Sequence, residues 1–167
     1  MNIYTYIGFY WCVWVGRKNT LDEFKLSYRA ANTLFPNVPT AAYSNVVKPD
    51  SVSILWNRVE NIKGHPWLHK LSALLATPFE QTIFLDNDVY LLRSDFVTSM
   101  RMIAFMSDFA LPVDPRRFVV PMGCTAMINY NVTRSRKLLQ TAQHILKNSL
   151  FPKRMRRGDQ EAIWLAW

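Results

Sequence analysis

The hydrophobic positions of this chain follow two patterns along its length. Short runs rich in aromatic and β-branched residues favour buried strands, and longer segments with apolar residues every three or four positions favour helices. The runs that predict strands cover residues 3–16, 40–47, 51–59, 82–92, 107–113 and 124–130. The segments that predict helices cover residues 19–36, 65–76, 94–106 and 133–147, and a last helix opens near Gly158. Strands separated by helices of about 10 to 15 residues are typical of an α/β sandwich with a mostly parallel central sheet flanked by helices.

Polar and proline residues at the ends of these segments support the predicted helices. Asn19 or Thr20 can cap the first helix, and Pro36 ends it. The second helix has Pro66 at its start, where proline is well tolerated, and Pro78 after its end. The helix boundaries therefore have support beyond the hydrophobic pattern.

Composition places the chain among globular proteins. Half of its 167 residues are hydrophobic and 19% are charged, which excludes disorder as a class. The length suits a single domain over residues 1–167. Because the last predicted helix still runs at Trp167, we leave open a domain truncated at its C-terminus.

The apolar N-terminal run could be mistaken for a targeting segment. Residues 3–16 follow no positive residue and lead to no small-residue cleavage site. The run is also shorter than the roughly 18 apolar residues that a membrane span needs. We therefore interpret it as the first strand and expect a cytoplasmic protein.

The net charge of +8 favours an anionic ligand, an anionic surface or nucleic acid. Nucleic acid is not expected, because the aromatic residues lie within apolar strands and are not interleaved with Lys and Arg. The basic run Lys153–Arg157 is by default a solvated loop. In a functional role it would contact a diphosphate, an anionic acceptor or a membrane surface.

Two carboxylates interrupt the strand predicted over residues 82–92. Residues 82–85 are its buried part, and Asp86 lies where it emerges at the carboxyl edge of the sheet, where ligands bind. Strand alternation would point Asp86 and Asp88 to one side and Asn87 to the other. Two neighbouring carboxylates repel each other unless a cation lies between them, and open oxygen ligation suits Mn2+ or Mg2+. The alternative is a turn with a capping aspartate.

Residues 69–92, HKLSALLATPFEQTIFLDNDVYLL, resemble the core of the nucleotide-diphospho-sugar transferases, the GT-A glycosyltransferases. In that family a helix bearing a lysine precedes a strand that ends in an Asp-x-Asp metal motif. Further similar segments are residues 23–45, 108–117, 124–131 and 158–163. The resemblance covers almost the whole chain and implies a GT-A (Rossmann-like) sandwich. It also implies metal-dependent transfer of a sugar from a nucleotide diphosphate, with UDP favoured, to a hydroxyl of a saccharide, glycan or other acceptor.

The resemblance implies roles for the residues around the acidic pair. Asp86 and Asp88 would bind Mn2+ (or Mg2+) at the donor phosphates, with Asp88 favoured as the direct ligand, and Asn87 would belong to the same donor site. Lys70 would face the phosphates or brace an aspartate, and its alternative is a solvated lysine on an amphipathic helix. The histidines of the chain lack ligand spacing to this pair.

Other implied contacts come from residues far away along the chain. Asp159 and Gln160 would contact the donor sugar or the acceptor, with Asp159 a candidate base; alternatively Asp159 caps a helix and Gln160 is exposed. Tyr10 and Trp11 would line the base pocket, or else belong to the core. Thr125 occupies the middle of the family's Asn-Ser/Thr-Gly signature. The flanking Cys124 and Ala126 depart from that signature.

The sequence leaves two further interpretations of the chain's function open. One is a catalytically inactive, nucleotide-binding relic of the same fold, and the other is a basic nucleic-acid-binding module. P-loop and dinucleotide-binding enzymes are not favoured, because neither GxxxxGK[ST] nor GxGxxG occurs.

Overall fold

The computed structural model describes residues 7–13, 20–44, 55–58, 66–112, 125–129, 132–148 and 158–167. The strands are β1 (Ile7–Val13), β2 (Thr40–Ser44), β3 (Leu55–Arg58), β4 (Gln81–Leu85), β5 (Phe109–Ala110) and β6 (Thr125–Asn129). The helices are α1 (Thr20–Leu34), α2 (Pro66–Leu75), α3 (Phe96–Met106), α4 (Thr133–Asn148) and α5 (Gly158–Ala166). Each predicted strand and helix has a counterpart among these elements, so the α/β pattern is confirmed.

The strands form a six-stranded sheet in the order β3-β2-β1-β4-β6-β5. Strands β1 to β4 run parallel to one another, whereas β6 is antiparallel to both of its neighbours. The prediction of a mostly parallel sheet is therefore confirmed. The chain passes from β1 to β2 on one side of β1 and later returns to β4 on the other side. Such a reversal marks the carboxyl edge between β1 and β4 as the place where an α/β sheet binds ligands.

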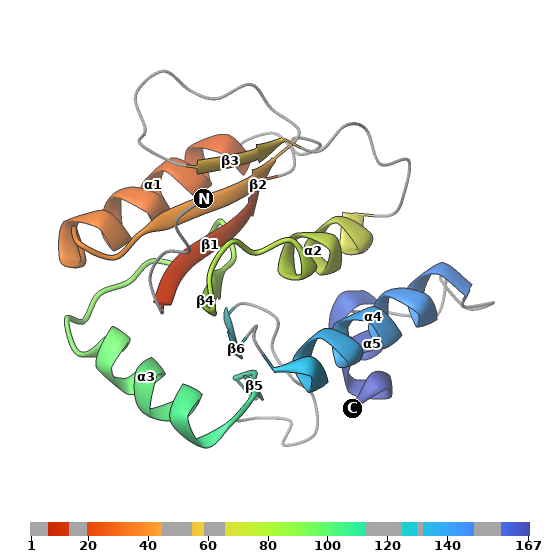
Figure 1. The fold of residues 1–167 in the computed structure, drawn as a ribbon. Coiled ribbons are helices and arrows are strands. Elements are labelled where there is room, and N and C mark those ends of the chain that lie inside the picture. The colour runs from red at the N-terminus through yellow and green to blue at the C-terminus, as the bar shows by residue number, and fades with distance from the viewer. Residues whose placement is uncertain are drawn as a thin grey trace.

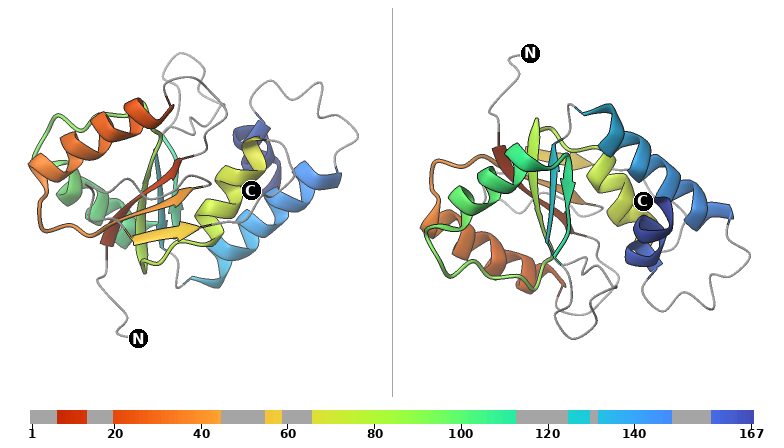
Figure 2. Two further views of the ribbon diagram at one scale, coloured as in Figure 1. Left: turned by 90° about the horizontal axis from the view of Figure 1, so that it is seen from above. Right: turned by 90° about the horizontal axis from the view of Figure 1, so that it is seen from below.

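Alternation along the central strands divides the core into two layers. Phe9, Trp11 and Ile83 belong to the layer that α1 and α3 cover. Tyr10 and Phe84 point to the opposite layer, which contains buried residues of α2, α4 and α5. Figures 1 and 2 show the same division, with α1 and α3 on one side of the sheet and the other three helices across it. Because both faces are covered, the central strands are apolar on both sides, as in other parallel sheets.

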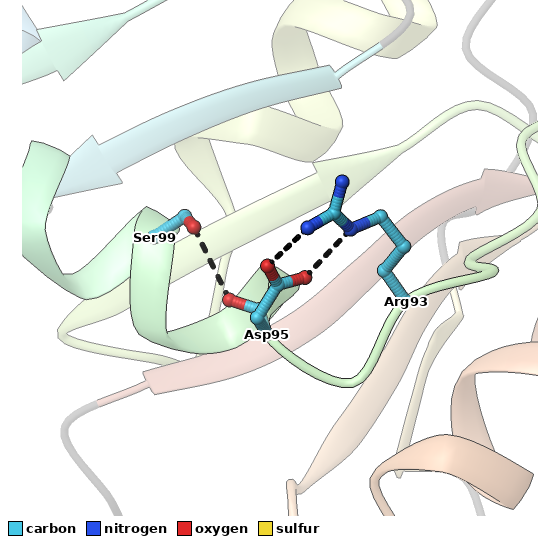
Figure 3. A network of polar contacts seen from close by, with 3 residues as sticks. All are labelled: Arg93, Asp95 and Ser99. Atoms are coloured by element: carbon cyan, nitrogen blue, oxygen red, sulfur yellow. Dashed lines mark hydrogen bonds and ion pairs between the residues drawn. The ribbon is translucent and has the colours of Figure 1, made fainter.

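Helix α3 begins two residues later than the sequence predicts, at Phe96 instead of Ser94. Its N-cap residue Asp95 makes no capping hydrogen bond with its side chain. Instead, Arg93 donates from Nε to Oδ1 of Asp95 at 3.0 Å and from Nη2 to Oδ2 at 2.6 Å, and Ser99 Oγ donates to the Asp95 carbonyl (Figure 3). The hydrogen bonds from Arg93 lower the pKa of the Asp95 carboxyl. Arg93 thus occupies the carboxylate that would otherwise cap the first turn.

The buried phenol of Tyr43 on β2 should make the free energy of unfolding sensitive to alkaline pH. Burial raises the pKa of Tyr43, nearby Cys12 raises it further, and a hydrogen bond with Ser72 lowers it. Above about pH 10 the unfolded chain releases this proton while the folded chain keeps it, so the free energy of unfolding should fall. We expect Tyr43→Phe to lose this component of the alkaline decline. Urea unfolding at a series of pH values checks this, and an unchanged slope in the variant would contradict it.

Candidate functional site

The acidic pair lies in a turn at the carboxyl end of β4. The strand ends at Leu85, and the Val89 amide donates to the Asp86 carbonyl at 3.1 Å. The expectation that strand alternation orients Asp86, Asn87 and Asp88 is therefore wrong, because the strand does not continue through them. Asn and Asp favour turns, since their side chains tolerate and support turn backbones. The turn predicted as the alternative is present, and it lies at the ligand-binding edge of the sheet.

Asp86 forms an ion pair with Lys70 of α2. The Lys70 Nζ donates to Asp86 Oδ1 at 2.6 Å, and the side chains are 17% and 31% exposed, respectively. The same ammonium lies 5.2 Å from the centroid of the Phe84 ring. Of the roles that the family resemblance implies for Lys70, the structure shows contact with the aspartate. The ion pair compensates one of the two negative charges in the turn.

Asn87 fastens the turn to the neighbouring strand. Its Nδ2 donates to the Cys12 carbonyl near the end of β1, at 3.0 Å. Its Oδ1 is buried and has no hydrogen-bond partner among the described residues. We therefore assign Asn87 a structural role at the carboxyl edge of the sheet, where it holds the turn against β1.

The chain beyond the turn is held by a second set of hydrogen bonds. Asp88 is exposed, and the carbonyl of the next residue, Val89, accepts a hydrogen bond from Ser27 Oγ at 2.5 Å. The same hydroxyl accepts a hydrogen bond from Trp11 Nε1 at 3.0 Å. Ser27 of α1 therefore connects β1 to the segment after the acidic pair, a role that sequence reasoning missed. The spacing of these residues along the chain does not indicate that Ser27 has this role.

Tyr10 and Trp11 belong to the core, and this corrects their expected place in a base pocket. Both side chains are 0% exposed. Tyr10 packs edge-on against Phe84, and Trp11 packs edge-on against Phe24 of α1. Neither ring has surface left for a stacked base. Trp11 contributes to the site indirectly, through its hydrogen bond to Ser27.

The remaining predicted site residues lie on β6 and α5. Thr125 begins β6 and pairs with Leu85, so its backbone lies at the same edge of the sheet as Asp86. Asp159 and Gln160 lie in the first turn of α5, directly after Gly158, whose φ of 25° favours glycine. Cys124 and the basic run Lys153–Arg157 lie outside the described residues.

The donor set of the turn fits a hard divalent cation with open coordination positions. Among the described residues, no group of three or more His, Cys, Asp or Glu side chains could bind a metal. The turn offers two carboxylates, of which Asp86 is paired with Lys70 and Asp88 is exposed. Mg2+ and related ions are commonly bound by one or two carboxylates, with substrate phosphates and water as the other ligands. These carboxylates therefore fit Mn2+ or Mg2+.

A separate cavity of about 650 Å³ lies between the ends of α3, α4 and α5. Its lining includes Phe109 of β5, which pairs with Ile128. Ile128 also pairs with Thr82, at the beginning of β4. The cavity is thus level with the start of β4, whereas Asp86 follows its end. It is not part of the candidate donor site.

Comparison with known proteins identifies the fold. No family model and no curated protein sequence matches the chain. Among solved structures, the glycosyltransferase GlyE of Streptococcus pneumoniae TIGR4 superposes with a TM-score of 0.73 at 8% sequence identity. The match covers 95% of this chain and 42% of GlyE. The chain has a glycosyltransferase fold.

The chain spans about two fifths of the length of GlyE. A second similar structure, that of residues 1–349 of S. aureus TarS, has a TM-score of 0.44 at 13% identity, and the match covers 62% of this chain and 34% of that one. In the part of the chain that the structure describes, no helix is long and apolar enough to cross a membrane.

The contribution of the Lys70–Asp86 ion pair to stability can be tested by substitution. Lys70→Met should lower the free energy of unfolding by about 1–3 kcal/mol, because it leaves a partly buried carboxylate without its charged hydrogen-bond donor. Urea unfolding at neutral pH measures the loss.

Lys25→Met is the matched control for this substitution. Lys25 lies 3.7 Å from Asp22 in a more exposed ion pair on α1, with side chains 38% and 77% exposed. Exposed pairs of this kind contribute at most about 0.5 kcal/mol. Equal losses in the two variants would show that the Lys70–Asp86 pair is an ordinary surface contact.

Proposed function

We propose that this chain carries the donor-binding part of a metal-dependent glycosyltransferase. The reaction is transfer of a sugar from a nucleotide diphosphate, with UDP favoured, to a hydroxyl of a saccharide, glycan or other acceptor. The main support is the Asp86–Asn87–Asp88 turn, which follows the central strand of a glycosyltransferase fold and is braced by Lys70 at 2.6 Å. An acidic pair held in place at a ligand-binding edge is suited to a metal–diphosphate complex.

The carboxylates of the turn have different roles in this proposal. Asp88 is exposed and is the direct ligand of Mn2+ or Mg2+, whereas Asp86 shares its charge between the cation and Lys70. When bound, the cation neutralises negative charge that develops on the diphosphate leaving group. Asn87 keeps both carboxylates at the edge of β1 through its hydrogen bond to Cys12.

The residues of β6 and α5 complete the proposed site. Thr125 lies at the same edge as the turn and is assigned to the donor. Asp159 and Gln160, at the N-terminal turn of α5, are assigned to the donor sugar and the acceptor hydroxyl. A carboxylate at position 159 can accept the proton that an acceptor hydroxyl loses on attack.

Release of nucleotide from sugar nucleotides tests the reaction. The chain would be incubated with a panel of UDP- and GDP-linked sugars, with Mn2+ or with EDTA, and the freed nucleotide measured by chromatography. We expect release from one or more UDP-sugars with Mn2+ and none with EDTA. Release of nucleotide at the same rate with EDTA as with Mn2+ would contradict metal dependence. No release from any donor by folded protein would contradict the proposed activity.

A further inference from the structure

Large apolar side chains are exposed at the β5 edge of the molecule, away from the candidate donor site. On α3, Phe105 is 93% exposed, Met106 84% and Met102 65%. Trp167, after the end of α5, is 74% exposed. Figure 1 shows α3 and the C-terminus at the same side of the molecule, on either side of β5. Exposed apolar groups that gather in this way mark an interaction surface.

The exposed face of α3 also carries a cation. Arg101 and Phe105 are one helical turn apart, as are Met102 and Met106, so these four side chains share one face of the helix. All four are exposed, whereas Ala104 of the same helix is buried in the core. The face therefore combines long apolar side chains with a guanidinium.

Helix α4 adds cations beside this face. The 650 Å³ cavity joins Met106 and Trp167 to Arg134 and Lys137 of α4. Neither α3 nor α4 contains an acidic residue, while together they carry Arg101, Arg134, Arg136, Lys137 and Lys147. The acidic residue at the cavity is Asp108, which lies 3.8 Å from Arg134. The apolar surface is thus bordered by an excess of positive charge.

This combination favours an anionic lipid surface over other partners. A second copy of the chain would bring like charges together, because every Asp, Glu, Lys or Arg position in α3 and α4 is a Lys or an Arg. Single-stranded nucleic acid binds through aromatic rings that offer a free face for stacking. Here Trp167 packs against Phe109, and Met102 and Met106 are not aromatic, so among the described residues Phe105 is the one freely exposed ring on this face. Protruding apolar side chains flanked by Lys and Arg are typical of segments that lie in the headgroup region of an anionic membrane.

We propose that the α3–α4 edge, defined by Arg101, Met102, Phe105, Met106, Arg134, Lys137 and Trp167, docks on an anionic lipid membrane. Phe105 and Met106 enter the boundary between headgroups and acyl chains. Arg101, Arg134 and Lys137 pair with the lipid phosphates. Because the cavity is level with the start of β4 and the acidic turn follows its end, docking leaves the donor site free.

Flotation of the full chain with lipid vesicles tests the proposal. Vesicles of equal parts phosphatidylglycerol and phosphatidylcholine would be compared with vesicles of phosphatidylcholine alone. We expect binding to the anionic vesicles only, and weaker binding as salt rises and screens the charges. Arg134→Gln/Lys137→Gln should weaken binding about 25-fold, from roughly fivefold for each cation. Phe105→Glu/Met106→Glu should remove binding while far-UV circular dichroism stays unchanged.

Leu26→Glu is the matched control. Leu26 is an exposed apolar residue of α1, 53% exposed, on a helix whose charges have both signs. Its substitution should leave flotation unchanged. Equal losses in Leu26→Glu and Phe105→Glu/Met106→Glu would overturn the proposal, as would absence of flotation by folded wild type. Without flotation, a dimer or a DNA complex that Phe105→Glu/Met106→Glu disrupts would assign the surface to that partner instead.

Discussion

Asp88→Asn should lower kcat/KM for the proposed transfer, or for hydrolysis of the donor sugar, by more than about 100-fold. Substituting a residue that merely supports a metal ligand typically costs about 10- to 100-fold, and Asp88 is proposed as a ligand itself. Because its side chain is exposed, the substitution should leave the free energy of unfolding nearly unchanged. Asp86→Asn should differ, since it also weakens the ion pair with Lys70 and so lowers stability. Initial rates at several Mn2+ concentrations, combined with urea unfolding, separate the two effects.

Asp22→Asn provides the control for a lost surface carboxylate. Asp22 is an exposed residue in the first turn of α1, where its carboxylate lies 3.7 Å from Lys25 Nζ. Its substitution should leave the rate and the Mn2+ dependence intact. An Asp88→Asn variant with the wild-type rate and the wild-type Mn2+ dependence would remove Asp88 from the proposed metal site.

Gly8→Ala should lower the free energy of unfolding by about 1–3 kcal/mol, the usual cost of overpacking a core. A Cβ atom at position 8 would lie 2.5 Å from Cγ of Phe79, which is closer than any normal van der Waals contact. Phe79 is 3% exposed and packs edge-on against Tyr10, so its ring has little room to move. Glycine at this position of β1 therefore allows the segment after α2 to approach the sheet closely. Urea unfolding of wild type and variant measures the effect.

A second substitution shows whether Phe79 is the cause. Phe79→Leu removes ring atoms from the contact and lowers the free energy of unfolding by itself. In combination with Gly8→Ala, it should recover part of the free energy of unfolding that Gly8→Ala loses. A double-mutant cycle measures that coupling, because residues in contact give non-additive changes in free energy. Strictly additive changes would place the strain of Gly8→Ala elsewhere.

The sequence predicts the layers of the fold well because they follow from hydrophobic alternation. Phe9 and Trp11 alternate with Tyr10 along β1, and each side of the strand is covered by helices. The hydrophobic pattern did not predict the end of β4, although the family resemblance implied a strand that ends at the Asp-x-Asp motif. Val89 and Leu91 continue the apolar alternation past the acidic pair, and Leu91 is buried in the core, yet the chain there is not a strand. The pattern reports burial, and a segment can be buried without pairing in a sheet.

Family resemblance supplied the residues of the candidate site, whereas the contacts between distant elements that hold this site in place were not predicted. The resemblance implied that Lys70 faces the phosphates or braces an aspartate, and the structure shows its contact with Asp86. The hydrogen bonds from Asn87 to Cys12 and from Ser27 to Val89 join residues 75 and 62 positions apart. Such pairs depend on which strands are neighbours and on how α1 packs, and no local pattern encodes either. The same packing explains why Tyr10 and Trp11 are core residues.

Calorimetric titration of UDP into the full chain tests whether the acidic turn after β4 forms a metal-dependent donor site. The titration would be made with Mn2+ and with EDTA, and repeated with the Asp86→Asn/Asp88→Asn variant after circular dichroism has shown that it is folded. We expect that wild type binds UDP with Mn2+, that EDTA abolishes this binding, and that the variant does not bind. Binding of equal strength with EDTA, or no binding by folded wild type in Mn2+, would contradict a metal-dependent donor site at the end of β4.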